Sequence, residues 1–185
     1  MAGSPGFFNN MSKTQLKKTL SVLSADDMRE LILSLYEARA EAKDYLDFFV
    51  NPDIDRRLEK ARAAIRKEMF RTSRGYNKAR STRIRRFIND ISSLDAGDEA
   101  VCEIMTYAVE CAAKAGSDQT VKEVTQKGMC RLLSDTVRLA DRVGMLGVYL
   151  PRITAAVDDM NSNIFRKNLF KRVLKETLEE TLNDL

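Results

Sequence analysis

The sequence contains no histidine and no tryptophan. Without histidine, the chain cannot build a Ser-His-Asp triad, a Cys-His pair, a His-ligated zinc or haem site, or a two-His iron site. The three cysteines, Cys102, Cys111 and Cys130, are an odd number and show no Cys-x-x-Cys spacing. A disulfide framework or a cysteine-rich metal site is therefore not predicted. We expect reduced, half-buried thiols, no metal and no cofactor.

The motifs of nucleotide catalysis are missing as well. There is no G-x-x-x-x-G-K-[ST] and no G-x-G-x-x-G sequence to hold phosphates. Glu103 and Glu110 stand seven residues apart on one predicted helix, but they lack the histidine partners of a helical di-iron site. We expect them on a solvated face. No catalytic residue is predicted, and the chain is not expected to be an enzyme.

Glycine and proline are scarce, with 8 and 3 among 185 residues, while apolar residues make up 44%. This composition excludes a wholly disordered or loop-rich all-β chain and favours helices. No apolar run approaches the length of a membrane span, and the start MAGSPGFFNN lacks the features of a signal peptide. We expect a cytoplasmic protein without a membrane association, residues 1–11 as a disordered leader or tag remnant, and residues 12–185 as a single all-helical domain.

Helix start and stop signals predict about eight helices. Capping boxes begin at Ser12 and Ser24, and Pro52 stops the helix that Ser24 opens. Inside that helix, apolar residues recur every three or four positions from Met28 to Phe49, and this stripe must pack on something. The expected helices cover 12–23, 24–51, 53–74, 77–94, 98–115, 118–143, 151–160 and 163–184.

Short connections between these segments indicate antiparallel helical hairpins, which would recur near the roughly 40 to 47 residues of HEAT repeats. The predicted fold class is all-α, a stack of antiparallel hairpins. A HEAT-like right-handed superhelix and an irregular helical bundle both remain open. Gly128, inside one predicted helix, indicates close contact with another helix.

Four segments carry a family resemblance: MSKTQLKKTLSVL, RELILSLYEARAEAKDYLDFFVNP, IRKEMF and KARSTRIRRFINDI. They resemble a family of uncharacterised bacterial, Bacteroidetes-type, all-helical proteins of unknown function. The resemblance covers residues 11 to about 115, and its most specific element is KTQLKK followed by DYLDFF and Asn51-Pro52. It implies an all-helical fold in a bacterial cytoplasm, and it implies no activity, catalytic residue or cofactor.

Charge is distributed very unevenly along the chain. Thirteen Lys and Arg but only two acids, Glu59 and Glu68, lie between Arg56 and Arg86. At about 100° per residue, part of this set forms a sector of about 60° on one helix. The sector lies opposite the apolar positions 54, 58, 61, 65 and 69. We call it the cationic row: Arg56, Lys60, Lys67, Arg71 and Arg74.

Two interpretations of this surface remain open. It is a candidate surface for an anion or a nucleic acid, formed by Arg56, Lys60, Lys67, Arg71, Arg74, Lys78, Arg80 and Arg83, with Tyr76 as a stacking residue. Alternatively, the nine acids of residues 24–55 compensate its charge. The predicted function is a non-enzymatic helical scaffold or interaction module with a protein partner, and nucleic-acid binding is the alternative. The sequence gives no oligomeric state.

Overall fold

A computed structural model describes residues 12–70, 79–161 and 169–185. Within these residues the protein is all-α, with nine helices and no strand, which confirms the predicted fold class. The chain divides into two compact units, residues 1–51 and residues 52–185. We call them the N-terminal unit and the C-terminal unit and describe each by itself. The single domain expected over 12–185 stays a prediction.

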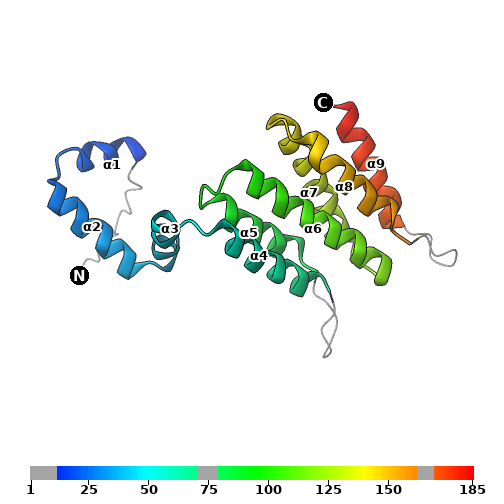
Figure 1. Cartoon of the computed structure of the whole chain (residues 1–185), viewed down its shortest axis with the longest axis horizontal. Coiled ribbons are helices and arrows are strands. Elements are labelled where there is room, and N and C mark those ends of the chain that lie inside the picture. The colour runs from blue at the N-terminus through cyan, green and yellow to red at the C-terminus, as the bar shows by residue number, and fades with distance from the viewer. Residues whose placement is uncertain (1–11, 71–78, 162–168) are drawn as a thin grey trace, which may run out of the picture. The chain divides into compact units, whose positions relative to one another are not determined.

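The N-terminal unit contains α1 (Lys13–Leu20), α2 (Ala25–Ala38) and α3 (Ala40–Val50) (Figure 1). Both predicted capping boxes are confirmed. The Ser12 hydroxyl accepts a hydrogen bond from the backbone N–H of Gln15, and the Gln15 side chain accepts one from the backbone N–H of Ser12. Ser24 and Asp27 make the same reciprocal pair at the start of α2.

The single helix predicted over 24–51 is wrong, because the backbone at Arg39 is extended, with φ −135° and ψ 117°. The break permits a contact between α2 and α3. The Tyr36 hydroxyl donates to Asp47 Oδ1 at 2.9 Å, and the Lys43 amine lies 5.2 Å from the centre of the Tyr36 ring. In one straight helix Tyr36 and Asp47 would be separated by about 16 Å along the axis.

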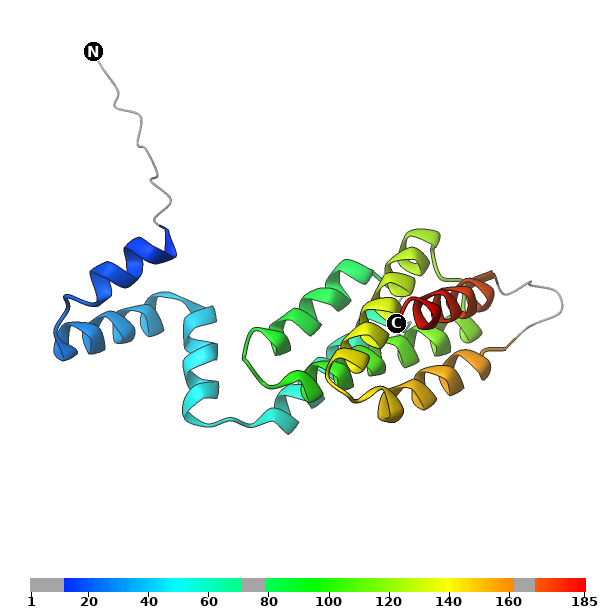
Figure 2. The ribbon, with the colours of Figure 1, turned by 90° about the horizontal axis from the view of Figure 1, so that it is seen from above.

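The C-terminal unit is built around α6. Its helices are α4 (Ile54–Met69), α5 (Ser81–Ser92), α6 (Asp98–Asp118), α7 (Glu123–Arg142), α8 (Leu146–Asp158) and α9 (Leu169–Asn183). α6 packs against each of the other five, and Figure 1 and Figure 2 show it among these neighbours. The neighbouring helices are antiparallel, as predicted. A HEAT-like repeat stays a prediction.

Small side chains on α6 make this central position possible. The buried residues of α6 include Ala100, Cys102, Ala108, Cys111, Ala112, Ala113 and Ala115. The predicted helix end at Gly116 is wrong, because α6 continues to Asp118. Gly116 instead leaves room for other helices. A Cβ at this position would lie 2.7 Å from Met160 Cε and 2.7 Å from Phe170 Cδ1.

Two other helix starts differ from the prediction. α7 begins at Glu123 rather than near 118, and α8 begins at Leu146 rather than at Pro151. Pro151 therefore lies in the second turn of α8, where its missing N–H leaves the carbonyl of Gly147 without the usual helical donor. None of the helices in the described parts of the chain is long and apolar enough to cross a membrane.

Gly128 in α7 is a close-contact glycine, as the sequence predicts. A Cβ built there would lie 2.3 Å from Ser81 Oγ and 2.5 Å from Ser81 Cβ, at the start of α5. A Cβ built at Gly147 in α8 would have no neighbouring atom within 4 Å. The two glycines form a matched pair for testing whether α7 and α5 are in contact.

We expect Gly128→Ala to lower the free energy of unfolding by about 1–3 kcal/mol, because the new methyl group forces α5 and α7 apart. Gly147→Ala should raise it by about 0.4–1 kcal/mol, because alanine restricts the unfolded chain without a clash. Thermal and urea unfolding of both variants measure these changes. Equal effects of the two substitutions would contradict the contact between α7 and Ser81.

Candidate binding surfaces

The cationic row begins as predicted on α4. The Asp53 side chain caps this helix by accepting the Arg56 backbone N–H at 2.9 Å. The apolar face is buried at Leu58, Ala61, Ile65 and Met69, and Ile54 is half-buried. The opposite face exposes Arg56, Lys60 and Lys67, and none of these three makes an ion pair with another residue that the structure describes.

The sequence predicted that the row continues along the same helix to Arg71 and Arg74. This prediction is wrong for α4. α4 ends at Met69, because Phe70 has an extended backbone with φ −101° and ψ 153°. Four members of the predicted surface, Arg71, Arg74, Tyr76 and Lys78, lie outside the described residues. On α4 itself, the row therefore consists of Arg56, Lys60 and Lys67.

Arg80 and Arg83, the remaining members of the predicted surface, lie against the carboxylate of Glu68. This side chain is only 9% exposed. Arg80 donates to Glu68 Oε1 through Nε at 2.9 Å and through its backbone N–H at 3.2 Å, and Arg83 Nη1 lies 3.7 Å from Glu68 Oε2. Burial acts to raise the pKa of Glu68, but the hydrogen bonds from Arg80 outweigh it and lower that pKa below its usual value. The charges of Arg80 and Arg83 are thus partly neutralised.

The same contacts hold the end of α4 beside the start of α5. The carbonyl of Glu68 accepts the Ala79 N–H at 3.0 Å. The Thr125 hydroxyl of α7 donates to the carbonyl of Ala79 at 2.5 Å, and the Gln119 side chain donates to the carbonyl of Met69 at 2.9 Å. Glu68 and Arg80 therefore have a structural role in joining these helices to the rest of the C-terminal unit.

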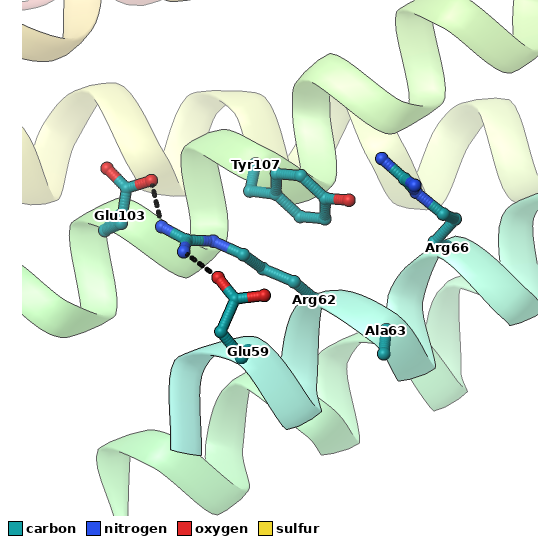
Figure 3. A pocket seen from close by; sticks show the side chains of 6 residues that line it. All are labelled: Glu59, Arg62, Ala63, Arg66, Glu103 and Tyr107. Atoms are coloured by element: carbon teal, nitrogen blue, oxygen red, sulfur yellow. Dashed lines mark hydrogen bonds and ion pairs between the residues drawn. The ribbon is translucent and has the colours of Figure 1, made fainter. Parts of the chain in front are cut away.

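A second charged feature crosses α4, α6 and α8, and we call it the ion-pair ladder. Its members in order are Glu59, Arg62, Glu103, Arg152 and Glu110. Arg62 bridges Glu59 at 2.6 Å and Glu103 at 2.7 Å (Figure 3). Arg152 bridges Glu103 at 2.5 Å and Glu110 at 2.9 Å. Every adjacent pair in the ladder has opposite charges.

The solvated face predicted for Glu103 and Glu110 is therefore wrong. Their side chains are 21% and 29% exposed, and both accept hydrogen bonds from Arg152. Burial acts to raise the pKa of Glu103, but the hydrogen bonds from Arg152 and Arg62 lower that pKa below its usual value. Hydrogen bonding to Glu103 is also the main cause that raises the pKa of Arg152.

Part of the ladder lines a pocket of about 440 Å³ between α4 and α6. Its lining residues are Glu59, Arg62, Ala63, Arg66, Glu103 and Tyr107 (Figure 3). The Arg62 guanidinium lies 5.8 Å from the centre of the Tyr107 ring and is held by two carboxylates. The two carboxylates that line this pocket, Glu59 and Glu103, are therefore both paired with Arg62.

The cysteines are placed as core residues. Cys102, Cys111 and Cys130 are free thiols, and each is buried rather than half-buried as predicted. Burial is the main cause that raises the pKa of all three, which favours the unreactive protonated thiol. Among the described residues, no group of three or more Cys, Asp or Glu could hold a metal ion.

The N-terminal unit presents a surface that the sequence did not identify as a candidate site. α2 has no buried residue, and one of its faces is apolar. We call this face the α2 stripe: Met28, Leu31, Ile32 and Leu35, which are 38%, 40%, 47% and 46% exposed. The sequence showed an apolar stripe here, but only the structure shows that the rest of the described unit leaves it uncovered.

Comparison with known proteins gives a family match. A model described as a family of unknown function, DUF6155, matches residues 11–179. The match extends well beyond the residues 11–115 over which the sequence showed a resemblance. No curated protein and no solved structure matches the chain.

The ion-pair ladder predicts that the effect of Glu103→Gln on the free energy of unfolding depends on pH. Because the folded state lowers the pKa of Glu103, this carboxylate stabilises the fold above its unfolded-state pKa. That contribution is lost as the pH falls through the folded-state pKa. We expect Glu103→Gln to cost about 1–3 kcal/mol at neutral pH, the usual range for hydrogen bonds to a charged group.

As the pH falls through the folded-state pKa of Glu103, the wild-type side chain becomes protonated, so the difference between the two proteins should shrink. Urea unfolding at several pH values measures it. Glu179→Gln, at an exposed position of α9, is the control and should change the free energy of unfolding by less than about 0.5 kcal/mol. A cost of Glu103→Gln that does not vary with pH would contradict an ionised Glu103 in the ladder.

Proposed function

We propose that this chain, which belongs to the DUF6155 family, is a non-enzymatic helical interaction module whose partner is a protein. We further propose that it acts in the cytoplasm of a bacterium, as its resemblance to bacterial proteins implies. The α2 stripe is the observation that carries the proposal. Exposed apolar patches on a protein surface commonly mark sites of interaction.

The N-terminal unit is built to form helices, but it lacks a core of its own. Two capping boxes specify the starts of α1 and α2 through contacts between residues three apart. Among its described residues, only Phe48 is buried. A segment of this length seldom buries enough apolar surface by itself. The uncovered apolar side chains therefore favour a surface that is completed by a binding partner.

The spacing of the α2 stripe fits recognition through one helix face. Its residues stand at positions i, i+3, i+4 and i+7, the pattern by which an amphipathic helix binds an apolar surface. Asp26, Glu30 and Glu37 lie on the opposite face of α2, at about 100° per residue. This division leaves the stripe free of acidic side chains.

The double variant Ile32→Glu/Leu35→Glu tests the proposal, because it places two charges in the stripe. A tagged full-length chain should retain a specific protein from a lysate of its native host, and the variant should lose it. Leu33→Glu is the matched control, since Leu33 is 60% exposed on α2 but lies outside the stripe. Quantitative mass spectrometry of the retained proteins gives the readout. Equal retention by wild type and the double variant would contradict binding through the stripe.

Nucleic-acid binding is a second candidate, and the shortened cationic row supports it. Arg56, Lys60 and Lys67 are exposed on one face of α4 and make no ion pair with the rest of the described chain. Exposed cations along one face can bind phosphates without reading the base sequence. The neutralisation of Arg80 and Arg83 by Glu68 makes this support weaker than the sequence predicted.

If the row binds duplex DNA, log K should fall linearly with log salt, with a slope of about −0.9 for each neutralised phosphate. Replacing Arg56, Lys60 and Lys67 together by Glu should abolish binding and change the melting temperature little. The matched control replaces Lys114, Lys122 and Arg131, which are exposed on other faces, by Glu. Salt titrations with a mixed-sequence oligonucleotide measure binding. No binding by the wild type at about 50 mM salt would remove this candidate.

A further inference from the structure

We infer that α2 and α3 switch between the bent arrangement of the structure and one straight helix over residues 24–51, and that the protein partner binds the straight form. The inference rests on the proposed function, because it states how binding at the α2 stripe is regulated. Three features of the chain carry it: the helix-forming sequence at the break, the faces that stay in phase across the break, and the few contacts that hold the bend.

The break at Arg39 contains no residue type that would cause it. The segment 37–43 reads EARAEAK, without glycine, proline or a β-branched residue, and all of its residues are strong helix formers. The helical hydrogen bonds on either side are intact. The Arg39 N–H donates to the carbonyl of Leu35 at 3.0 Å, and the carbonyl of Arg39 accepts the Lys43 N–H at 3.0 Å. A change of the backbone dihedral angles at one residue would therefore join the two helices.

The apolar and acidic faces of α2 and α3 stay in phase across the break. At about 100° per residue, apolar residues of both helices fall within one sector of about 100°, and acids of both helices fall within an opposite sector of about 60°. Two helices that never join do not need a common phase. We call the apolar set the long stripe: Met28, Leu31, Ile32, Leu35, Ala42, Leu46, Phe49 and Val50. The acids are Asp26, Glu30, Glu37, Glu41 and Asp44. Arg39 falls in the apolar sector, where its side chain is long enough to reach water.

Few contacts hold the bent form. α3 packs against α2, Phe48 is buried, and the Tyr36 hydroxyl donates to Asp47. In the straight form Asp47 would stand about 16 Å from Tyr36 along the axis, and Phe48 would lie on the acidic side of the helix. Straightening therefore costs the burial of one aromatic side chain and one side-chain hydrogen bond.

The straight form would gain backbone hydrogen bonds in return. Within the described part of the chain, Arg39 makes no side-chain capping bond at the start of α3. In a continuous helix the N–H groups of residues 40–42 would donate to the carbonyls of residues 36–38. Three backbone hydrogen bonds and the burial of one aromatic side chain contribute stabilities of similar size, so the two forms are close in free energy.

The straight form presents the longer binding face. The α2 stripe covers about 11 Å of helix axis, whereas the long stripe would cover about 33 Å. Phe49 and Val50, which are 74% and 81% exposed, would then continue the face of α2. In the bent form α2 and α3 run in different directions (Figure 2), so a partner that lies along α2 would leave these side chains uncovered. A partner that contacts the whole long stripe would shift the equilibrium to the straight form.

Pulsed electron paramagnetic resonance of the full-length protein tests the switch. Spin labels at Glu30→Cys and Val50→Cys would stand about 30 Å apart along a straight helix and clearly closer in the bent form. The native thiols are buried, so the labels attach to the introduced cysteines. Both distances should be present, each in at least about a tenth of the molecules. A single distance, whether short or long, overturns the inference.

Two proline substitutions form a matched pair in the labelled protein. Ala40→Pro suits the first position of α3 after the extended Arg39, but in a straight helix it would clash with the carbonyl of Tyr36. It should remove the distance of about 30 Å. Ala25→Pro is the control, because residue 25 follows the extended Ser24 and is the first position of the helix in both forms. A long distance that persists in Ala40→Pro does not come from a straight helix and also overturns the inference.

Phe48→Ala shifts the equilibrium in the other direction. It removes a side chain that is buried only in the bent form, and alanine favours a helix in both. The ratio of straight to bent molecules should rise about tenfold or more. An unchanged ratio would contradict the assignment of the short distance to the bent form.

The lysate experiment separates this inference from the proposed function. If both hold, Ala40→Pro and Ile32→Glu/Leu35→Glu lose the retained protein and Ala25→Pro keeps it. If Ile32→Glu/Leu35→Glu loses the protein but Ala40→Pro retains it as the wild type does, the proposed function stands and the inference fails. If every variant retains the same proteins, the proposed function and the binding step of the inference fail, and the two label distances decide whether the switch itself exists.

Discussion

The close packing of five helices around α6 is the constraint on which the C-terminal unit depends. The interior side of α6 carries mainly alanine and cysteine, so its neighbours can approach closely. One consequence is the ion-pair ladder, because α4 and α8 both come near enough for Arg62 and Arg152 to reach the same carboxylate of Glu103. An acid that receives two guanidinium groups can stay ionised although most of it is buried. Apolar packing thus determines where the charges of this unit lie.

Features that depend on residues three or four apart were predictable from the sequence. The capping boxes at Ser12 and Ser24 and the buried positions of α4 belong to this class, since a short segment contains all of the information. The ladder does not, because Arg62 and Arg152 stand 41 and 49 residues from Glu103. The break at Arg39 was also missed. The continuous apolar pattern gave no sign of it, and the contact that the break permits joins Tyr36 to Asp47, 11 residues away.

The prediction of the cationic row failed for the same reason, because it could not include contacts between residues far apart in the sequence. Counting charges between Arg56 and Arg86 located the cationic row, and its α4 members are exposed as expected. The count treated Glu68 as one of two acids among thirteen cations. In the structure, this single buried carboxylate contacts two of the cations that were assigned to the surface, Arg80 and Arg83. The net charge of a segment therefore overestimates the number of cations available for binding wherever a buried acid pairs with several arginines.

The two units differ in what can stabilise them. The C-terminal unit buries apolar residues on all six of its helices, so tertiary packing supports its secondary structure. Among the described residues of the N-terminal unit, only Phe48 is buried, and its helices rely on capping boxes and on the contact between α2 and α3. Helices of 8 to 14 residues are marginal in water without tertiary contacts. Any partner that covers the α2 stripe would therefore supply the missing core, and binding would stabilise the helices that form the surface.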